Sequence, residues 1–188
     1  FVLSKEVNGW EKITKVLQNK SSKRLMDVLE DLPMKSKVGT VSGRRQSFLL
    51  SSRPDIIPIS VRGHIETRLD GLLDGRVSFL ILAEIGLKRL FESNEISKRH
   101  LGLNATRIRE EDWPTAPGQG AIAVHCRDED SSLTEKIRTI LNHEPTFDEV
   151  ERERSILKKL GGGCLYPAGV LSMGCLLYTS DAADDVIS

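Results

Sequence analysis

One cysteine stands where its thiol could be presented for chemistry. Cys164 follows three consecutive glycines, Gly161 to Gly163, and Pro167 comes three residues later. Glycine gives the backbone access to positive φ and lets another group approach closely, so the thiol could be exposed in a loop after a helix. The alternative is that the glycines end the helix and Cys164 packs as a small buried residue. The local sequence alone favours this second interpretation, because most cysteines are structural.

Five arginines follow predicted strands and indicate an anionic ligand. A lone arginine would be interpreted as a solvated surface charge, but five at one rim of a sheet predict a common role. Guanidinium groups match carboxylate or phosphate oxygens, and helix N-termini add backbone N–H donors. The sequence contains no Gly-x-x-x-x-Gly-Lys-Ser/Thr or Gly-x-Gly-x-x-Gly loop, so a small polyanion is favoured over a nucleotide. The five are Arg44, Arg45, Arg62, Arg68 and Arg89.

Alternating strands and short helices would position these arginines. This order is typical of a doubly wound α/β domain with a parallel sheet, whose ligands bind beyond the carboxyl ends of the strands. Ser42 is predicted to cap the first helix, and the second strand is predicted to be buried despite Pro58. The predicted strands are residues 38–41, 56–61 and 77–83, and the predicted helices are 43–52, 64–73 and 86–91.

The flanking regions are less regular. Residues 1–35 have only weak helical spacing and are interpreted as a surface excursion between domains, and residues 92–114 as a short helix and loop. Residues 114–120 are rich in proline and glycine and predict a hinge or a ligand-facing loop. Beyond them we expect a strand at 121–126, helices at 132–141 and 146–160, and a strand from 164 to 170.

The composition is that of an ordinary soluble protein. The 188 residues are 39% hydrophobic and 29% charged, with zero formal net charge, so neither nucleic acid nor a membrane is an expected partner. No apolar run approaches the roughly 20 residues needed to span a bilayer. Three cysteines form no disulfide framework and suit a reducing compartment. The four histidines show no metal-ligand spacing, so no metal is expected.

The last 14 residues follow no pattern set by the preceding chain. Residues 175–184 match the translation of a transposase adapter used in sequencing libraries. We therefore predict that residues 175–188 are an artefact of read-through. The alternative is a genuine C-terminal strand and tail.

Seven motifs, in order and at matching spacing, resemble the porphobilinogen deaminase (hydroxymethylbilane synthase) family. The resemblance covers roughly residues 36–170, and although each motif alone is weak, seven in register are specific. The motifs are VGTVSGRRQ at 38–46, VRGHIETRL at 61–69, ILAEIGLKRL at 81–90, PGQGA at 117–121, LNHEPT at 141–146, ER at 153–154 and LGGGC at 160–164.

This resemblance implies two lobes like those of periplasmic binding proteins and a small third α/β domain, only partly present here. It assigns 1–35 to an interdomain excursion entering domain 2, 36–114 to domain 2, 115–142 to a hinge returning to domain 1, and 143–174 to the start of domain 3. It also implies a cytoplasmic transferase of porphyrin and heme biosynthesis, or a plastid one in a photosynthetic eukaryote. A monomer is the family expectation.

The family's chemistry assigns roles to the motif residues. It condenses four porphobilinogen molecules into hydroxymethylbilane with loss of ammonia, on a dipyrromethane cofactor held by a thioether, here to Cys164. Each pyrrole carries an acetate and a propionate, which fits the polyanion that the arginines predict. The implied carboxylate-binding residues are Ser42, Arg44, Arg45, Arg62, Arg68, Arg89, Gln119 and Gly120.

Two departures from the family pattern matter. Val41 and Gly43 stand where the family usually has serine and leucine, and glycine in a helical turn costs on the order of 1 kcal/mol. The catalytic aspartate of the family's Lys-Asp-Leu/Val-Pro motif belongs before Phe1, and Asp31 lies too close to Arg44 to replace it. We therefore expect an internal fragment with no catalytic residue, inactive and poorly folded alone.

Two other functions fit some of these features. A two-lobe polyanion- or solute-binding module without catalysis explains the arginines but gives no role to Cys164. A degenerate relative could bind tetrapyrroles without making them. A pyrrole adduct on Cys164 would exclude the first alternative, and turnover would exclude the second.

Overall fold

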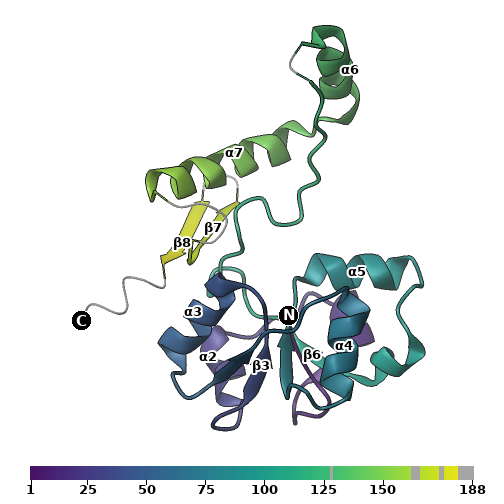
Figure 1. Cartoon of the computed structure of the whole chain (residues 1–188), viewed down its shortest axis with the longest axis vertical. Helices are drawn as coiled ribbons and strands as arrows, with labels where there is room; N and C mark the ends of the chain where they lie inside the picture. The colour runs from purple at the N-terminus through teal and green to yellow at the C-terminus, as the bar shows by residue number, and fades with distance from the viewer. Residues whose placement is uncertain (128, 162–165, 174–175, 182–188) are drawn as a thin grey trace. The chain divides into compact units, whose positions relative to one another are not determined.

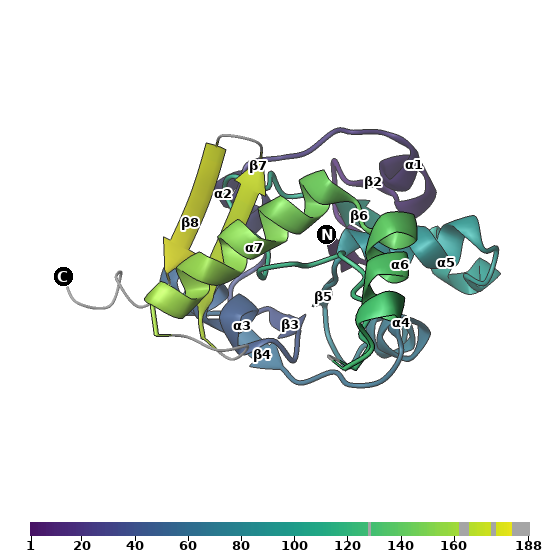
Figure 2. The same cartoon turned by 90° about the horizontal axis from the view of Figure 1, so that it is seen from above.

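The computed structural model describes residues 1–127, 129–161, 166–173 and 176–181. The chain divides into two compact units (Figures 1 and 2). The first contains Phe1–Trp113 with two short C-terminal pieces, and the second contains Pro114–Cys164 and Ala168–Ser180.

A six-stranded sheet forms the centre of the first unit, in the order β2-β6-β1-β5-β3-β4. β3 pairs in parallel with both β4 and β5, as the sequence predicts. β1 is antiparallel to β5 and β6, so the sheet is mixed rather than wholly parallel. The strands are β1 Val2–Ser4, β2 Glu11–Lys12, β3 Lys37–Gly39, β4 Ile57–Ile59, β5 Phe79–Ile81 and β6 Asn104–Thr106.

Helices cover both faces of this sheet. Val2 packs with residues of α2 and α3, whereas its neighbour Leu3 packs with residues of α1, α4 and α5, since successive strand side chains point to opposite faces. Figure 1 shows α2 and α3 on one side of the sheet and α4 and α5 on the other. The helices are α1 Ile13–Gln18, α2 Leu25–Glu30, α3 Gly43–Ser52, α4 Ile65–Leu73, α5 Glu84–Glu92 and the 3₁₀ helix η1 Lys98–Gly102.

Three predictions for the first unit are wrong. Residues 1–35 are not a surface excursion, because β1 lies inside the sheet and Leu3 is fully buried. β6, within a predicted helix and loop, is a buried strand whose polar sequence gave no apolar pattern. β4 is an edge strand with Ile57 exposed, where a proline that lacks an N–H is tolerated.

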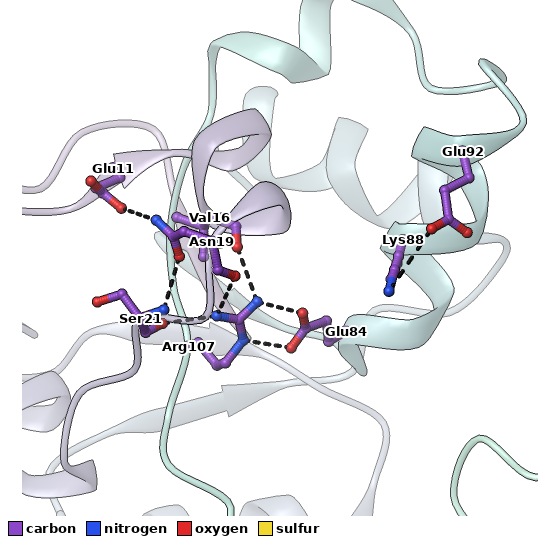
Figure 3. A network of polar contacts seen from close by, with 8 residues as sticks. All are labelled: Glu11, Val16, Asn19, Ser21, Glu84, Lys88, Glu92 and Arg107. Carbon is purple, nitrogen blue, oxygen red and sulfur yellow. Dashed lines mark hydrogen bonds and ion pairs between the residues drawn. The ribbon is translucent and has the colours of Figure 1, made fainter.

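A partly buried arginine fastens the end of β6 to two helices (Figure 3). Arg107 donates Nε to Glu84 Oε2 at 2.7 Å and Nη2 to Glu84 Oε1 at 2.5 Å, at the start of α5. It also donates to the backbone oxygens of Val16, Asn19 and Ser21 at 2.9–3.0 Å. These bonds raise the pKa of Arg107, chiefly through Glu84. One side chain therefore joins three segments distant in sequence.

The second unit is the smaller of the two. It contains α6 Ser131–Leu141, α7 Glu144–Lys159, β7 Ala168–Met173 and β8 Leu176–Asp181. Both helices were predicted, although α7 begins two residues early with Pro145 in its first turn, where the fixed φ of proline suits a helix. α7 packs on β7, which pairs with β8 (Figure 2).

Two segments of the second unit differ from expectation. The predicted strand at 121–126 is absent, because residues 121–127 have no regular structure and no described strand pairs with them. β8 lies within the adapter-like residues 175–188. Strand pairing uses backbone groups that any chain carries, so this pairing is compatible with the predicted origin of the tail.

Candidate anion-binding site

The carboxyl ends of β3, β4 and β5 meet at one edge of the sheet, because these strands run in parallel. Arg44 and Arg45 lie in the first turn of α3, which follows β3, the middle strand of the three. Arg62 and Arg68 follow β4, and Arg89 lies in the helix that follows β5. The five arginines therefore belong to the three connections that leave this edge.

The turn between β3 and α3 is held by hydrogen bonds among neighbouring residues. Ser42 Oγ accepts from the Arg45 backbone N–H at 3.4 Å, which confirms Ser42 as the helix cap. Buried Thr40 accepts from the Ser42 N–H through Oγ1 and from Gln46 Nε2 through its carbonyl oxygen, both at 3.2 Å. Sequence reasoning missed Thr40 and Gln46, although a threonine two residues before a serine cap is a recognisable signal for such a turn.

Three of the arginines are electrostatically coupled. Arg44 is only 8% exposed, and burial lowers its pKa to about 10, with the charge of Arg45 adding to the shift. Burial also lowers the pKa of Arg45, and the charge of Arg68 lowers it further. Desolvation and like charges both disfavour the cationic form, so a bound anion would relieve an existing electrostatic cost.

Two of these arginines are held by hydrogen bonds to backbone oxygens. Arg45 Nη1 donates to the carbonyl oxygen of Ile81 at 3.3 Å, so it reaches from α3 to the end of β5. Arg68 Nε donates to the carbonyl oxygen of Gly63 at 2.8 Å, in the turn before α4. The edge is thus crossed by guanidinium groups anchored on backbone oxygens.

Arg62 and Arg89 occupy more peripheral positions. Arg62 is exposed in the turn that follows β4. Arg89 is exposed in the last turn of α5, about five residues and therefore roughly 7 Å along the axis from the helix start. The structure therefore brings Arg44, Arg45 and Arg68 together and sets Arg89 back from the edge.

Gln119 and Gly120 belong to a tight turn in the second unit. The Gln119 N–H donates to Ala116 O at 2.9 Å, and the Ala121 N–H donates to Gly118 O at 3.1 Å. Gly118 and Gly120 have φ of 71° and 95°, a region that favours glycine. Gln119 and Gly120 are exposed, so the turn presents them to solvent.

Three further points from the sequence concern a cofactor-bearing cysteine, a catalytic aspartate and a metal site. Cys164 lies outside the described residues. Asp31 accepts hydrogen bonds from Trp10 Nε1 at 2.6 Å and Lys23 Nζ at 3.2 Å, which is a structural role. Within the described ranges, no three histidine, cysteine, aspartate or glutamate side chains are grouped to hold a metal ion.

None of the described helices has the length and apolar character that crossing a membrane would require.

The site's chemistry suits a dipyrromethane. Guanidinium groups and a capped helix N-terminus can bind and orient carboxylates, and the acetate and propionate groups of pyrroles are such anions. The desolvated charge of Arg44 is the feature that fits them best.

Comparison with known proteins agrees with this chemistry. A family model described as "Porphobilinogen deaminase, dipyromethane cofactor binding domain" matches residues 10–135. A porphobilinogen deaminase of Thermus thermophilus is 38% identical over 157 residues, 84% of this chain and 48% of that protein. One from Desulforudis audaxviator is 41% identical over 143 residues, 76% of this chain and 43% of that protein.

A third relative gives the same result. A probable porphobilinogen deaminase of Methanothermobacter thermautotrophicus is 40% identical over 142 residues, 76% of this chain and 46% of that protein. The chain thus spans slightly less than half the length of these curated relatives. It belongs to the porphobilinogen deaminase family, and residues 10–135 match that family's dipyrromethane cofactor-binding domain.

Proposed function

We propose that this chain is part of a porphobilinogen deaminase, a transferase that condenses four porphobilinogen molecules into hydroxymethylbilane with loss of ammonia. The observation that carries the proposal is the cluster of Arg44, Arg45 and Arg68 at the carboxyl edge of the sheet. It lies within the matched cofactor-binding domain. In the same proposal the protein is cytoplasmic and monomeric.

In this proposal the arginines bind and orient pyrrole carboxylates. Arg44 gains most from a carboxylate, because its charge is already desolvated. The Ser42 hydroxyl and the first turn of α3 add hydrogen-bond donors and a favourable dipole. When bound through Cys164, the dipyrromethane supplies the covalent anchor for the growing chain. Arg62, Arg68 and Arg89 contribute further charge, and Gln119 and Gly120 contribute polar contacts.

The proposal assigns binding to residues 1–188 and catalysis to a carboxylate outside them. Asp31 is the one residue here that echoes the family's catalytic motif, and its carboxylate is already bonded to Trp10 and Lys23. A group that protonates the leaving amine must lie within hydrogen-bond reach of it. We therefore expect the 188-residue chain alone to show no turnover.

The covalent anchor is tested on the full-length gene product. Acid Ehrlich reagent should report a bound dipyrromethane, and mass mapping should place it on the Cys164 peptide. Cys164→Ser should abolish the adduct, whereas Cys126→Ser should retain it, since Cys126 Sγ contacts Thr134 Oγ1 at 3.2 Å in the second unit. A bare Cys164 thiol in a folded protein would overturn the proposal and favour a polyanion-binding module.

The carboxylate contacts are tested by substitution in the same protein. Arg44→Gln should raise KM for porphobilinogen or weaken retention of the cofactor by about ten-fold, the effect of losing a charged hydrogen bond. Arg76→Gln is the matched control, because Arg76 is exposed just before β5, at the opposite end of that strand. Equal effects of the two substitutions would remove the case for a specific site.

A further inference from the structure

In the second unit, a buried carboxylate joins a helix to a turn and to a strand. Glu153 is 6% exposed and is the one residue of α7 that is buried. Its Oε2 accepts from the Gly118 backbone N–H at 2.7 Å, and its Oε1 accepts from the Ser172 backbone N–H at 2.9 Å. A carboxylate is costly to bury unless hydrogen-bonded, so these two bonds explain how it is tolerated there. They join α7 both to the turn at 117–120 and to β7.

The chain leading into this turn lies directly against β7. The Val170 N–H donates to Thr115 O at 2.9 Å. A Cβ added to Gly169 would come within 2.4 Å of Pro114 O, so β7 has no room for a side chain there. A Cβ on Gly118 would meet Val150 of α7 at 3.4 Å. The segment that leads into the turn therefore contacts both α7 and β7, and Glu153 binds Gly118 at the end of this segment.

We propose that Glu153 is a positioning residue for substrate and cofactor binding, acting through the turn at 117–120. The inference rests on the proposed function, in which Gln119 and Gly120 contact pyrrole carboxylates. Glu153 fixes Gly118, and the next two residues are the exposed ones. Glu153 itself does not bind the anion, because it is buried and its negative charge would repel a carboxylate.

The geometry distinguishes a carboxylate from its amide. A carboxylate offers two acceptor oxygens, one for each N–H, whereas glutamine offers one oxygen and one NH₂ group. Glu153→Gln keeps the shape of the side chain but sets a donor against one of the two N–H groups. The expected result is the release of either the turn or β7 from α7, without a cavity.

The experiment uses the full-length holoenzyme. Glu153→Gln should raise KM for porphobilinogen about ten-fold, as for the loss of a charged hydrogen bond, while kcat changes little because uniform binding is what is lost. Glu151→Gln, at an exposed position two residues away on α7, should leave both constants unchanged. Glu153→Asp, which keeps the charge but shortens the reach, provides a second variant if glutamine prevents folding.

Hydrogen exchange on the unaltered protein tests the contact without any substitution. The amides of Gly118 and Ser172 should exchange slowly, and Glu153→Gln should accelerate at least one of them. Fast exchange at Gly118 in the unaltered protein would overturn the proposal, as would an unchanged KM in a folded Glu153→Gln enzyme.

The adduct on Cys164 separates this proposal from the one on which it rests. An adduct with an unchanged KM in Glu153→Gln would refute positioning and leave the deaminase function intact. A missing adduct in the unaltered protein would refute the deaminase function itself. If Glu153→Gln lowers both the thermal stability and kcat while KM stays unchanged, Glu153 has only a structural role.

Discussion

The two units of this chain are ordered by different means. In the first unit, helices α1 to α5 all bury apolar side chains against one or other face of a sheet. In the second unit, α6 buries no residue and α7 buries only Glu153. Apolar residues remain exposed there, among them Ile122, Ile140 and Phe147. The helices of the first unit therefore depend on apolar burial, whereas in the second unit β7 buries Ala168 and Val170 and directional hydrogen bonds join α7 to its neighbours.

This contrast separates two properties of a helix: that it forms, and that its apolar face is buried. Helices were predicted at the positions of α6 and α7 as they were for α3 and α4. A sequence pattern can indicate a helix, but what covers the apolar face of that helix depends on residues far away in sequence. Substitutions that probe burial should therefore give large effects in the first unit and small ones on α6.

The largest effect is expected from Leu3→Ala. Leu3 is fully buried in β1, between β5 and β6, so its truncation should lower the free energy of unfolding by about 2–5 kcal/mol. Ile140→Ala, on α6 and 75% exposed, should change it by less than about 0.5 kcal/mol. Urea denaturation followed by circular dichroism measures both. A large loss for Ile140→Ala would show that α6 is covered in solution and would break the contrast.

A smaller loss is expected when the polar network of the first unit is cut. Arg107→Met removes the contacts to Glu84 and to three backbone oxygens, and should cost about 2 kcal/mol. Lys88→Met is the control, since its 3.9 Å ion pair with Glu92 is exposed and exposed pairs contribute little. Figure 3 shows both pairs. Equal thermal stabilities of the two variants would mean that apolar burial alone maintains the first unit.

The acid sensitivity of the first unit should depend on Asp55. Its carboxylate accepts from Arg53 Nε at 2.7 Å and Nη2 at 2.9 Å, and from the Lys35 N–H at 2.9 Å. These bonds, chiefly those from Arg53, hold the pKa of Asp55 far below its usual range. A carboxylate whose pKa is lower in the folded than in the unfolded protein stabilises the fold at pH values above its unfolded pKa, which is near 4. This stabilisation is lost as the pH falls below that value.

The Asp55→Asn variant should therefore be less stable at neutral pH and lose less stability on acidification below about pH 4. Arg53→Gln should show the same shallower acid slope, because it removes the partner that lowers the pKa. Urea midpoints measured from pH 7 down to pH 2 give both quantities. An unaltered slope in both variants would assign the acid sensitivity to other groups.

Much of the first unit was predictable from local sequence. The parallel strands β3, β4 and β5, the bounds of α3 and the Ser42 cap follow from apolar runs and capping chemistry within about ten residues. β1 and β6 were missed because their burial depends on pairing with each other and with distant strands, and a local apolar pattern does not reveal such pairing.

The candidate site was predictable in its chemistry but not in its geometry. The rim of arginines follows from strand ends, yet the coupling of Arg44, Arg45 and Arg68 requires the sheet order to be known. Glu153 carried no signal of burial, because a glutamate among charged helix residues reads as solvated. Its role depends on Gly118 and Ser172, which are 35 residues before and 19 residues after it.

The smallest effect is expected at Gly43 in the first unit, with Gly169 in the second unit as its contrast. Gly43 opens α3, has an ordinary negative φ, and an added Cβ would meet nothing within 4 Å. Gly43→Ala should therefore stabilise the chain by about 0.5 kcal/mol, mainly by restricting the unfolded state. Gly169→Ala should instead destabilise, since its Cβ would press on Pro114 O at 2.4 Å.

Thermal unfolding of both variants measures the change in stability at each glycine. The sign of each change matters more than its size. A gain at Gly43 would mean that its departure from the family's leucine leaves a helix turn weaker than it could be, with no packing reason for glycine. A loss at Gly43 would mean that the first turn of α3 depends on backbone freedom beside Arg44 and Arg45. In that case glycine would be required for the backbone conformation at the arginine-lined edge of the first unit, as well as in the turn that Glu153 holds.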